Sequence, residues 1–210
     1  MNDRKGFFVR RSRAVVSFAV GIILTCAGSA WAADCTIKQP EPGLDAPAES
    51  QWGGATVAAD DRQKIDDLFS RYAWALDQRD ADRFENLFTG AGSYEVCTGE
   101  GNIQIYIAPK AVIKMKLQQQ FDETKEVFQP RHVVVNTLLR SRKDHDKTFL
   151  DSKSTMAVTV QRAEGDRVLP EPDYTADVRA TLDKDKDTGV WRFATVTVYA
   201  DTPEFEPMGR

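Results

Sequence analysis

The hydrophobic pattern of this 210-residue chain changes its period once, at Pro130. Before this proline, apolar residues recur every three or four positions, which is typical of amphipathic helices. After it, apolar and polar residues alternate, which predicts strands at about 131–140, 148–161, 173–182 and 190–200. Helices followed by a meander of strands indicate an α+β domain, in which the helices cover one face of a curved antiparallel sheet.

Three helices are predicted before the change of period. The first spans residues 62–78, with Asp60 and Asp61 as its N-cap pair. Asp80 is the predicted N-cap of a second, shorter helix, and the segment from Gly90 to Gly92 is expected to end it.

Two short segments separate the second helix from the third. Residues 93–98 are predicted to form a strand, and residues 103–107 alternate as a strand would but also fit a loop. Pro109 suits the first turn of the third helix, and Pro130 blocks any continuation of that helix.

The first 32 residues have the three parts of a bacterial secretory signal peptide. Residues 1–13 form a basic head, an apolar run follows from Ala14 to Leu24, and Ala30-Trp31-Ala32 is an A-x-A cleavage site. The apolar run is too short to span a bilayer permanently. We therefore expect cleavage after Ala32, a periplasmic or secreted protein, and no stable membrane insertion after cleavage.

Two other forms of export remain open. Arg10-Arg11 resembles a twin-arginine signal, although Arg13-Ala14 stands where Phe-Leu is usual. Cys26 resembles a lipidation site, although Thr25 precedes it where Gly or Ala is usual. An uncleaved signal is a further alternative.

Removal of the signal leaves three regions and an acidic chain. Residues 33–59 are rich in Pro and Gly and form an irregular arm, residues 60–200 form the domain, and residues 201–210 form a tail. The remaining 23 basic and 31 acidic side chains give a net charge of −8. Because this charge repels phosphate backbones, nucleic-acid binding is disfavoured.

Two cysteines remain in the mature chain, Cys35 and Cys97. In an oxidising compartment an even number of cysteines predicts a disulfide, which would join the arm to the domain. Two unpaired thiols are the alternative.

Three blocks of sequence resemble SnoaL-like domains of the nuclear-transport-factor-2-like superfamily. They are the run Ile65–Asp80, the block Arg131–Asn136 and the block Gly189–Phe193, and the similarity extends over about residues 60–200. The resemblance implies a cone-shaped barrel, with a curved sheet wrapped around the N-terminal helix and a pocket at the open end. It also implies a homodimer formed through the outer face of the sheet, because an exposed apolar face needs a partner.

His132 and Asn136 are four residues apart on a predicted strand, so they are expected to share a face. Val133, Val135 and Leu139 point to the other face. Because an imidazole and a carboxamide need buried partners against helices, we expect the first face to line a pocket. There His132 can exchange protons near neutral pH, and Asn136 can bind substrate. A structural, hydrogen-bonded His132 is the alternative.

The resemblance adds Tyr72 and Asp77 to the candidate catalytic set with His132. Dehydratase relatives place a Tyr and an Asp at this spacing, although on an ideal helix such residues lie about 140° apart. The alternative for Asp77 is a solvated or capping carboxylate at a helix end. By the same resemblance Asp151 is a candidate substrate-binding residue, with surface pairing to Lys153 as the alternative.

Three functions compete for this domain. One is a cofactor-independent lyase, isomerase or cyclase acting on a hydrophobic small molecule; another is a non-catalytic binding or dimerisation module. A dioxygenase small subunit is the third, but the signal peptide argues against it. No cofactor motif is present, and two distant histidines disfavour a metal site.

Overall fold

The computed structural model describes residues 52, 57–97, 103–144, 147–162 and 169–201. All of these lie in one of two units of the chain, Ala33–Arg210. The signal peptide, most of the arm with Cys35, and the tail after Asp201 lie outside the described residues.

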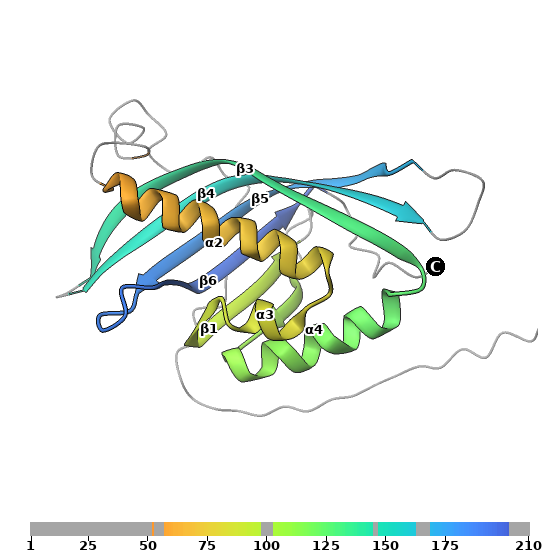
Figure 1. Ribbon diagram of the computed structural model, residues 1–210, viewed down its shortest axis with the longest axis horizontal. Helices are drawn as coiled ribbons and strands as arrows, with labels where there is room; N and C mark the ends of the chain where they lie inside the picture. Colours follow the sequence, from red (N-terminus) through yellow and green to blue (C-terminus); the bar gives the residue numbers. More distant parts are fainter. Residues whose placement is uncertain (1–51, 53–56, 98–102, 145–146, 163–168, 202–210) are drawn as a thin grey trace, which may run out of the picture. The chain divides into compact units, whose positions relative to one another are not determined.

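Three helices and six strands make up the described part of the chain (Figure 1). The helices are α2 (Ala59–Asp77), α3 (Ala81–Glu85) and α4 (Lys110–Thr124). The strands are β1 (Phe88–Cys97), β2 (Ile103–Ile107), β3 (Phe128–Asp144), β4 (Lys147–Arg162), β5 (Glu171–Lys184) and β6 (Trp191–Ala200). The α+β class is therefore confirmed. Among the described residues, no helix is both long and apolar enough to cross a membrane.

The strands form one mixed sheet in the order β2-β1-β6-β5-β4-β3. Four neighbouring pairs are antiparallel, but β1 pairs with β6 in parallel, so the purely antiparallel sheet expected from the sequence is wrong. The strands β3 to β6 follow one another in the chain and pair as antiparallel neighbours. β1 comes earlier, before α4, and pairs with the last strand, β6, so no hairpin turn fixes their relative direction. Pro130 is accommodated within β3 because β3 is an edge strand.

The sequence misplaced two boundaries near the start of the domain. The N-cap of α2 is Ala58, without a side-chain hydrogen bond, and Asp60 and Asp61 lie in the first turn. Their charges favour the positive end of the helix dipole, so acidic residues there need not be caps. Val57, which the sequence assigned to the arm, packs against the core.

Gly90 and Gly92 lie within a strand and do not terminate a helix. α3 is capped by Asp80, as predicted, but it ends at Glu85, and β1 begins at Phe88. The register of β1 against β6 is irregular between Phe88 and Ser93. A Cβ at Gly92 would lie 2.9 Å from the Cβ of Phe88, so glycine allows the strand to fold back closely here.

A cluster of aromatic rings joins α2 to the sheet. The ring of Tyr72 lies 5.3 Å from that of Phe84 and 6.0 Å from that of Phe193, measured between centroids. Figure 1 shows α2 lying along the sheet, with α3 and α4 near β1. This packing anchors the end of α2, where the candidate site begins.

The outer face of the sheet is mostly polar. Outward positions of the three central strands carry Asp151, Lys153, Thr155, Asp177, Arg179, Thr181, Thr195 and Thr197. The exposed apolar side chains of the sheet are instead concentrated on edge strand β3, at Val133, Val135 and Leu138. The broad apolar face on which the homodimer was argued is therefore absent from the described strands, and the homodimer stays a prediction.

Candidate active site

Asp77 and His132 are joined by two contacts through one oxygen. Asp77 Oδ1 accepts a hydrogen bond of 2.9 Å from the backbone N–H of His132, and it lies 2.7 Å from His132 Nδ1. The exposed fractions of the two side chains are only 8% and 10%. Because a carboxylate accepts the proton of Nδ1, Nε2 is the ring nitrogen left to exchange a proton with a ligand. Nε2 has no hydrogen-bond partner within the described part of the chain.

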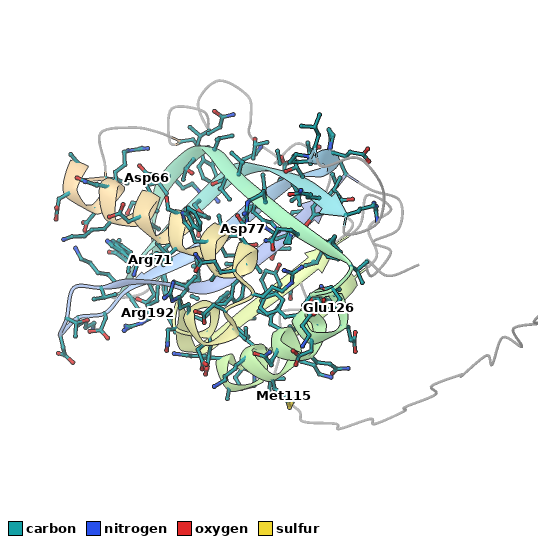
Figure 2. All side chains as sticks on the ribbon, turned by 45° about the vertical axis from the view of Figure 1, so that its right-hand side comes forward. Asp66, Arg71, Asp77, Met115, Glu126 and Arg192 are labelled. Carbon is teal, nitrogen blue, oxygen red and sulfur yellow. The ribbon has the colours of Figure 1, made fainter. Side chains whose placement is uncertain are left out.

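The end of α2 and the start of β3 position this pair. Asp77 is the last residue of α2, and Figure 2 labels it where the helix approaches β3. The side chain of Gln129 donates a 2.7 Å hydrogen bond to the backbone oxygen of Asp77. A carbonyl at the helix end and the first residues of the edge strand thus satisfy each other's hydrogen bonds.

Tyr72 and Asp77 point in different directions, as their helical spacing requires. Tyr72 has no exposed surface, and its hydroxyl makes no hydrogen bond of good geometry with a described residue, although it is close enough to the hydroxyl of Tyr94 for the two to shift each other's pKa. It belongs to the aromatic core and does not line either cavity described below. The structure therefore brings together Asp77 and His132, but not Tyr72.

The expected face of β3 is wrong in one respect. His132 packs against α2, because Asp77 supplies the buried partner that the sequence argument found lacking. Asn136 has a φ of 57°, and the ladder to β4 is irregular between Val135 and Leu138. This bulge reverses the alternation, so that Leu139 is fully buried whereas Val135 is exposed.

His132 also lines a small cavity between α2, α4 and the sheet. Its volume is about 60 Å³, which accommodates the centres of a few water-sized groups. Most of the wall is apolar and includes Leu76, Val96, Leu117, Phe121 and Phe128. An apolar cavity with few polar groups suits a hydrophobic ligand.

Two tyrosines, Tyr94 and Tyr174, share this cavity wall with His132. Burial raises the pKa of each hydroxyl above its ordinary value, and Tyr94 and the negative charge of Asp173 add to the shift at Tyr174. Both therefore stay protonated at neutral pH and can donate hydrogen bonds. The sequence analysis missed them, although each is an aromatic residue with a polar end at an inward strand position.

Arg79 completes the polar part of the wall. Its guanidinium donates to the backbone oxygen of Phe128, to that of Thr124 at 3.4 Å and to the side chain of Gln129 at 3.2 Å. Burial lowers the pKa of Arg79, and the negative charge of Glu126 partly opposes this effect. The sequence analysis also missed this residue, since nothing in the pattern shows which way a side chain beyond a helix end points.

A wider groove of about 620 Å³ lies between α2 and β3. Asp77 and His132 both line it, together with Asp66, Trp74 and Asn136. His132 thus separates the inner cavity from the groove, and Asn136 lies on the groove side of the imidazole. The cavity that His132 lines does not include Asp77 or Asn136.

Asp151 lies away from both spaces. It is on the outward side of β4, where Arg140 Nε is 3.4 Å from its Oδ2 and Thr181 donates to its Oδ1 at 3.2 Å. Neither cavity includes it in its lining. The carboxylate is paired on the sheet surface, as the alternative held, although the cation is Arg140 and not Lys153.

No metal centre is formed by the residues that the structure describes. Within them, no three His, Cys, Asp or Glu side chains are placed to hold an ion. Cys97 is fully buried at the end of β1, whereas Cys35 is outside the described residues. Their pairing stays a prediction.

Several solved structures share this fold. Aln2 from a Streptomyces species is 15% identical, over 68% of this chain and 91% of its own, with a TM-score of 0.53. ActVI-ORFA from Streptomyces coelicolor is 19% identical over 69% and 97%, with a TM-score of 0.56. A protein from Catenulispora acidiphila in complex with S-DNPA is 20% identical over 68% and 95%, with a TM-score of 0.52.

At these identities the likeness shows the fold alone. No curated protein matches the sequence. A family model described as a SnoaL-like domain matches residues 57–197, which is most of the chain. The chain therefore belongs to the SnoaL-like domain family.

Proposed function

We propose that this domain is a cofactor-independent lyase or isomerase that moves a proton on a hydrophobic small molecule. The observation that carries the proposal is the 2.7 Å contact between Asp77 Oδ1 and His132 Nδ1 beside an apolar cavity. A carboxylate that holds one ring nitrogen orients the imidazole and stabilises its protonated form. The SnoaL-like family includes polyketide cyclases and isomerases, which is compatible with such chemistry.

The proposed proton transfer uses the polar groups of the cavity wall. His132 Nε2 takes a proton from a carbon next to a carbonyl, and the electrons of the broken C–H bond pass to the carbonyl oxygen as an enolate. Tyr94 or Tyr174, both in the cavity wall, donates a hydrogen bond to that oxygen. Isomerisation is complete when the imidazolium returns the proton to another carbon. A lyase instead expels a group β to the carbonyl and protonates it as it leaves.

Proton exchange tests the proposal whatever the product of the reaction is. A panel of cyclic, aromatic and steroid-like ketones is incubated with the protein in D₂O, and loss of the α-proton signal is followed by NMR. His132→Gln should slow exchange by about 10²-fold or more, the usual contribution of general acid–base catalysis. Asp66→Asn serves as the control, because Asp66 lines the groove and not the cavity. Equal exchange rates per folded molecule in the wild type and His132→Gln would refute the proposal.

The alternative is a binding module that holds a ligand without turnover. The contact of 2.9 Å between Asp77 Oδ1 and the backbone N–H of His132 favours it, because this contact gives the carboxylate a structural role that needs no chemistry. Saturable binding of a panel compound, with no exchange or conversion at any pH between about 5 and 9, would select this alternative.

The site is proposed to work outside the cytoplasm. The basic head, apolar run and A-x-A motif of residues 1–32 support export. Intact-mass analysis of protein from a bacterial periplasm should show a chain that begins at Ala33. A chain that begins at Met1, or at a lipidated Cys26, would contradict cleavage after Ala32.

A further inference from the structure

Arg79 differs from every other residue in the wall of the inner cavity, because it carries a permanent charge. The described lining contains no Asp or Glu, and its other polar side chains are neutral or, for His132, neutral until protonated. An arginine keeps its charge throughout the physiological pH range. The cavity therefore has a positive end with no negative side chain in its wall.

The partners of Arg79 are all neutral oxygens. Its terminal nitrogens donate to the backbone oxygens of Thr124 and Phe128 and to the side chain of Gln129. The ring of Phe128 lies 5.6 Å from the guanidinium carbon. Arg79 has no ion pair within the described residues, since Glu126 acts on it only as a nearby charge. Three of the five N–H donors of the guanidinium are used, which leaves two for a ligand.

The backbone of Arg79 gives a second reason to examine its side chain. Its φ is 54°, and it follows directly after Gln78, the C-cap of α2. Glycine is the usual residue in this left-handed conformation at a helix end, because a Cβ is disfavoured there. Arg79 therefore places a long cationic side chain at a position where the backbone conformation favours glycine, which has no side chain.

We infer that the ligand of the inner cavity carries a carboxylate, which pairs with Arg79, so that the substrate class is small hydrophobic carboxylic acids. This inference rests on the proposed function only in taking the same cavity as the site. Arg79 is partly buried and makes no ion pair with a described residue, so an anionic ligand gains more from it than from an exposed cation, because burial reduces the screening by water. The hydrogen bond so formed is charge-assisted and stronger than a neutral one.

A comparison of acids with their methyl esters tests the inference directly. Benzoate, phenylacetate and cyclohexanecarboxylate are each titrated against the full mature chain, alongside their methyl esters, and binding is followed by NMR and thermal shift. The wild type should bind at least one acid about tenfold or more tightly than its ester, from the charge-assisted hydrogen bond. Similar affinities within every pair, or no binding by any acid, would overturn the inference without any variant being made.

Two variants separate ligand recognition from the structural hydrogen bonds of Arg79. Arg79→Gln should remove the preference for the acid and leave the ester unaffected. Arg83→Gln is the matched control, because Arg83 is exposed, does not line the cavity and bonds Gln78 and Asp80. If Arg79→Gln weakens acid and ester equally, Arg79 only holds α4 and β3 together and the inference fails.

Arg79→Gly covers the case in which the glutamine variant does not fold, because glycine suits the backbone of this position. It should also lose the preference for the acid, and retention of that preference would overturn the inference. The outcome is independent of proton transfer. Absence of any acid preference in the wild type, with His132-dependent exchange of neutral ketones intact, would refute the carboxylate alone. Preferred acid binding without any exchange would refute the catalytic proposal alone.

Discussion

One carboxylate oxygen, Asp77 Oδ1, contacts both the backbone nitrogen and the ring nitrogen Nδ1 of His132, at 2.9 and 2.7 Å. The backbone contact positions the edge strand β3 against the end of α2, and the ring contact orients the imidazole. The side chain of Asp77 therefore contributes both to the stability of the fold and to the electrostatics of the imidazole. A substitution that removes one contribution and keeps the other allows the two to be measured separately.

Asp77→Asn and Asp77→Ala should differ mainly in stability. The asparagine oxygen can still accept from the backbone N–H of His132, but it carries no charge to stabilise an imidazolium. We expect a loss of about 10²-fold or more in proton exchange with little change in unfolding free energy. Alanine also leaves the buried N–H without its acceptor, which costs about 1–3 kcal/mol. Chemical denaturation and the exchange assay together measure both effects.

Asp66→Asn is the matched control for these variants. Asp66 lies nearer the start of the same helix than Asp77 does (Figure 2), and it lines the groove. Among the described residues, no hydrogen bond joins its side chain to His132. It should leave both exchange and stability close to those of the wild type. If Asp77→Asn behaves like Asp66→Asn in the exchange assay, the charge of Asp77 has no catalytic role.

Much of the fold could be predicted because periodicity is a local property. The sequence predicted α2 and the four strands β3 to β6 within a few residues of their bounds in the structure. α2, β4 and β5 each bury one continuous face, so their apolar residues show the period directly. The parallel pairing of β1 with β6 leaves no such trace, since it depends on which distant strands meet.

The site was only partly predictable, for a related reason. Asp77 and His132 were predicted as catalytic candidates from the sequence, with the help of a family resemblance, and the structure brings them together. The bulge at Asn136 changes which side chains face inward, and one inserted residue cannot be read from alternation alone. Asp151 lines neither cavity, because the parity of its strand places it on the outer face of the sheet, beside Arg140.

Asp61 should make the fold sensitive to acid. It accepts hydrogen bonds from Lys184 at 2.7 Å and from Trp191 Nε1 at 2.9 Å, and so joins the start of α2 to the hairpin between β5 and β6. Burial acts to raise the pKa of Asp61, but these hydrogen bonds and the charge of Lys184 outweigh it and leave the pKa below its ordinary value.

A lowered pKa in the folded state means that the unfolded chain binds protons first as the pH falls. The stabilisation is therefore complete above the ordinary carboxyl pKa of about 4 and is lost as the pH falls through the lower folded value. Asp61→Asn should remove this part of the acid transition, measured as unfolding free energy against pH from about 6 to 2. An unchanged profile would show that the contact contributes nothing to stability.

The cysteines provide a test that does not involve the site. Cys97 is fully buried at the end of β1, and we predict that it pairs with Cys35 in the exported protein. Thiol titration of the denatured, unreduced mature chain should then give close to zero. Cys35→Ser should lower stability by about 2–5 kcal/mol, the usual effect of losing a disulfide from an exported domain. Two titratable thiols per mature chain would contradict the pairing.

The last prediction concerns three tyrosines whose surroundings assign them different tasks. Tyr72 is buried in the aromatic core, and its hydroxyl makes no hydrogen bond of good geometry with a described residue. Burial, together with neighbouring Tyr94, raises the pKa of Tyr72 well above its ordinary value. Tyr72→Phe removes an unsatisfied polar group, so stability should stay equal or rise by up to about 1 kcal/mol. Proton exchange should not change.

Tyr94→Phe and Tyr174→Phe should give the opposite result, because both residues line the cavity that His132 shares. Removal of a hydrogen bond to a developing enolate should slow exchange by about 10²-fold if that hydroxyl is the donor. Since each tyrosine is protonated at neutral pH, the loss should be independent of pH between about 6 and 9. Exchange rates of the three variants, each corrected for the folded fraction, decide the assignment. If Tyr72→Phe slows exchange strongly and the other two variants do not, the catalytic hydroxyl is that of Tyr72 on α2, as the family resemblance implies.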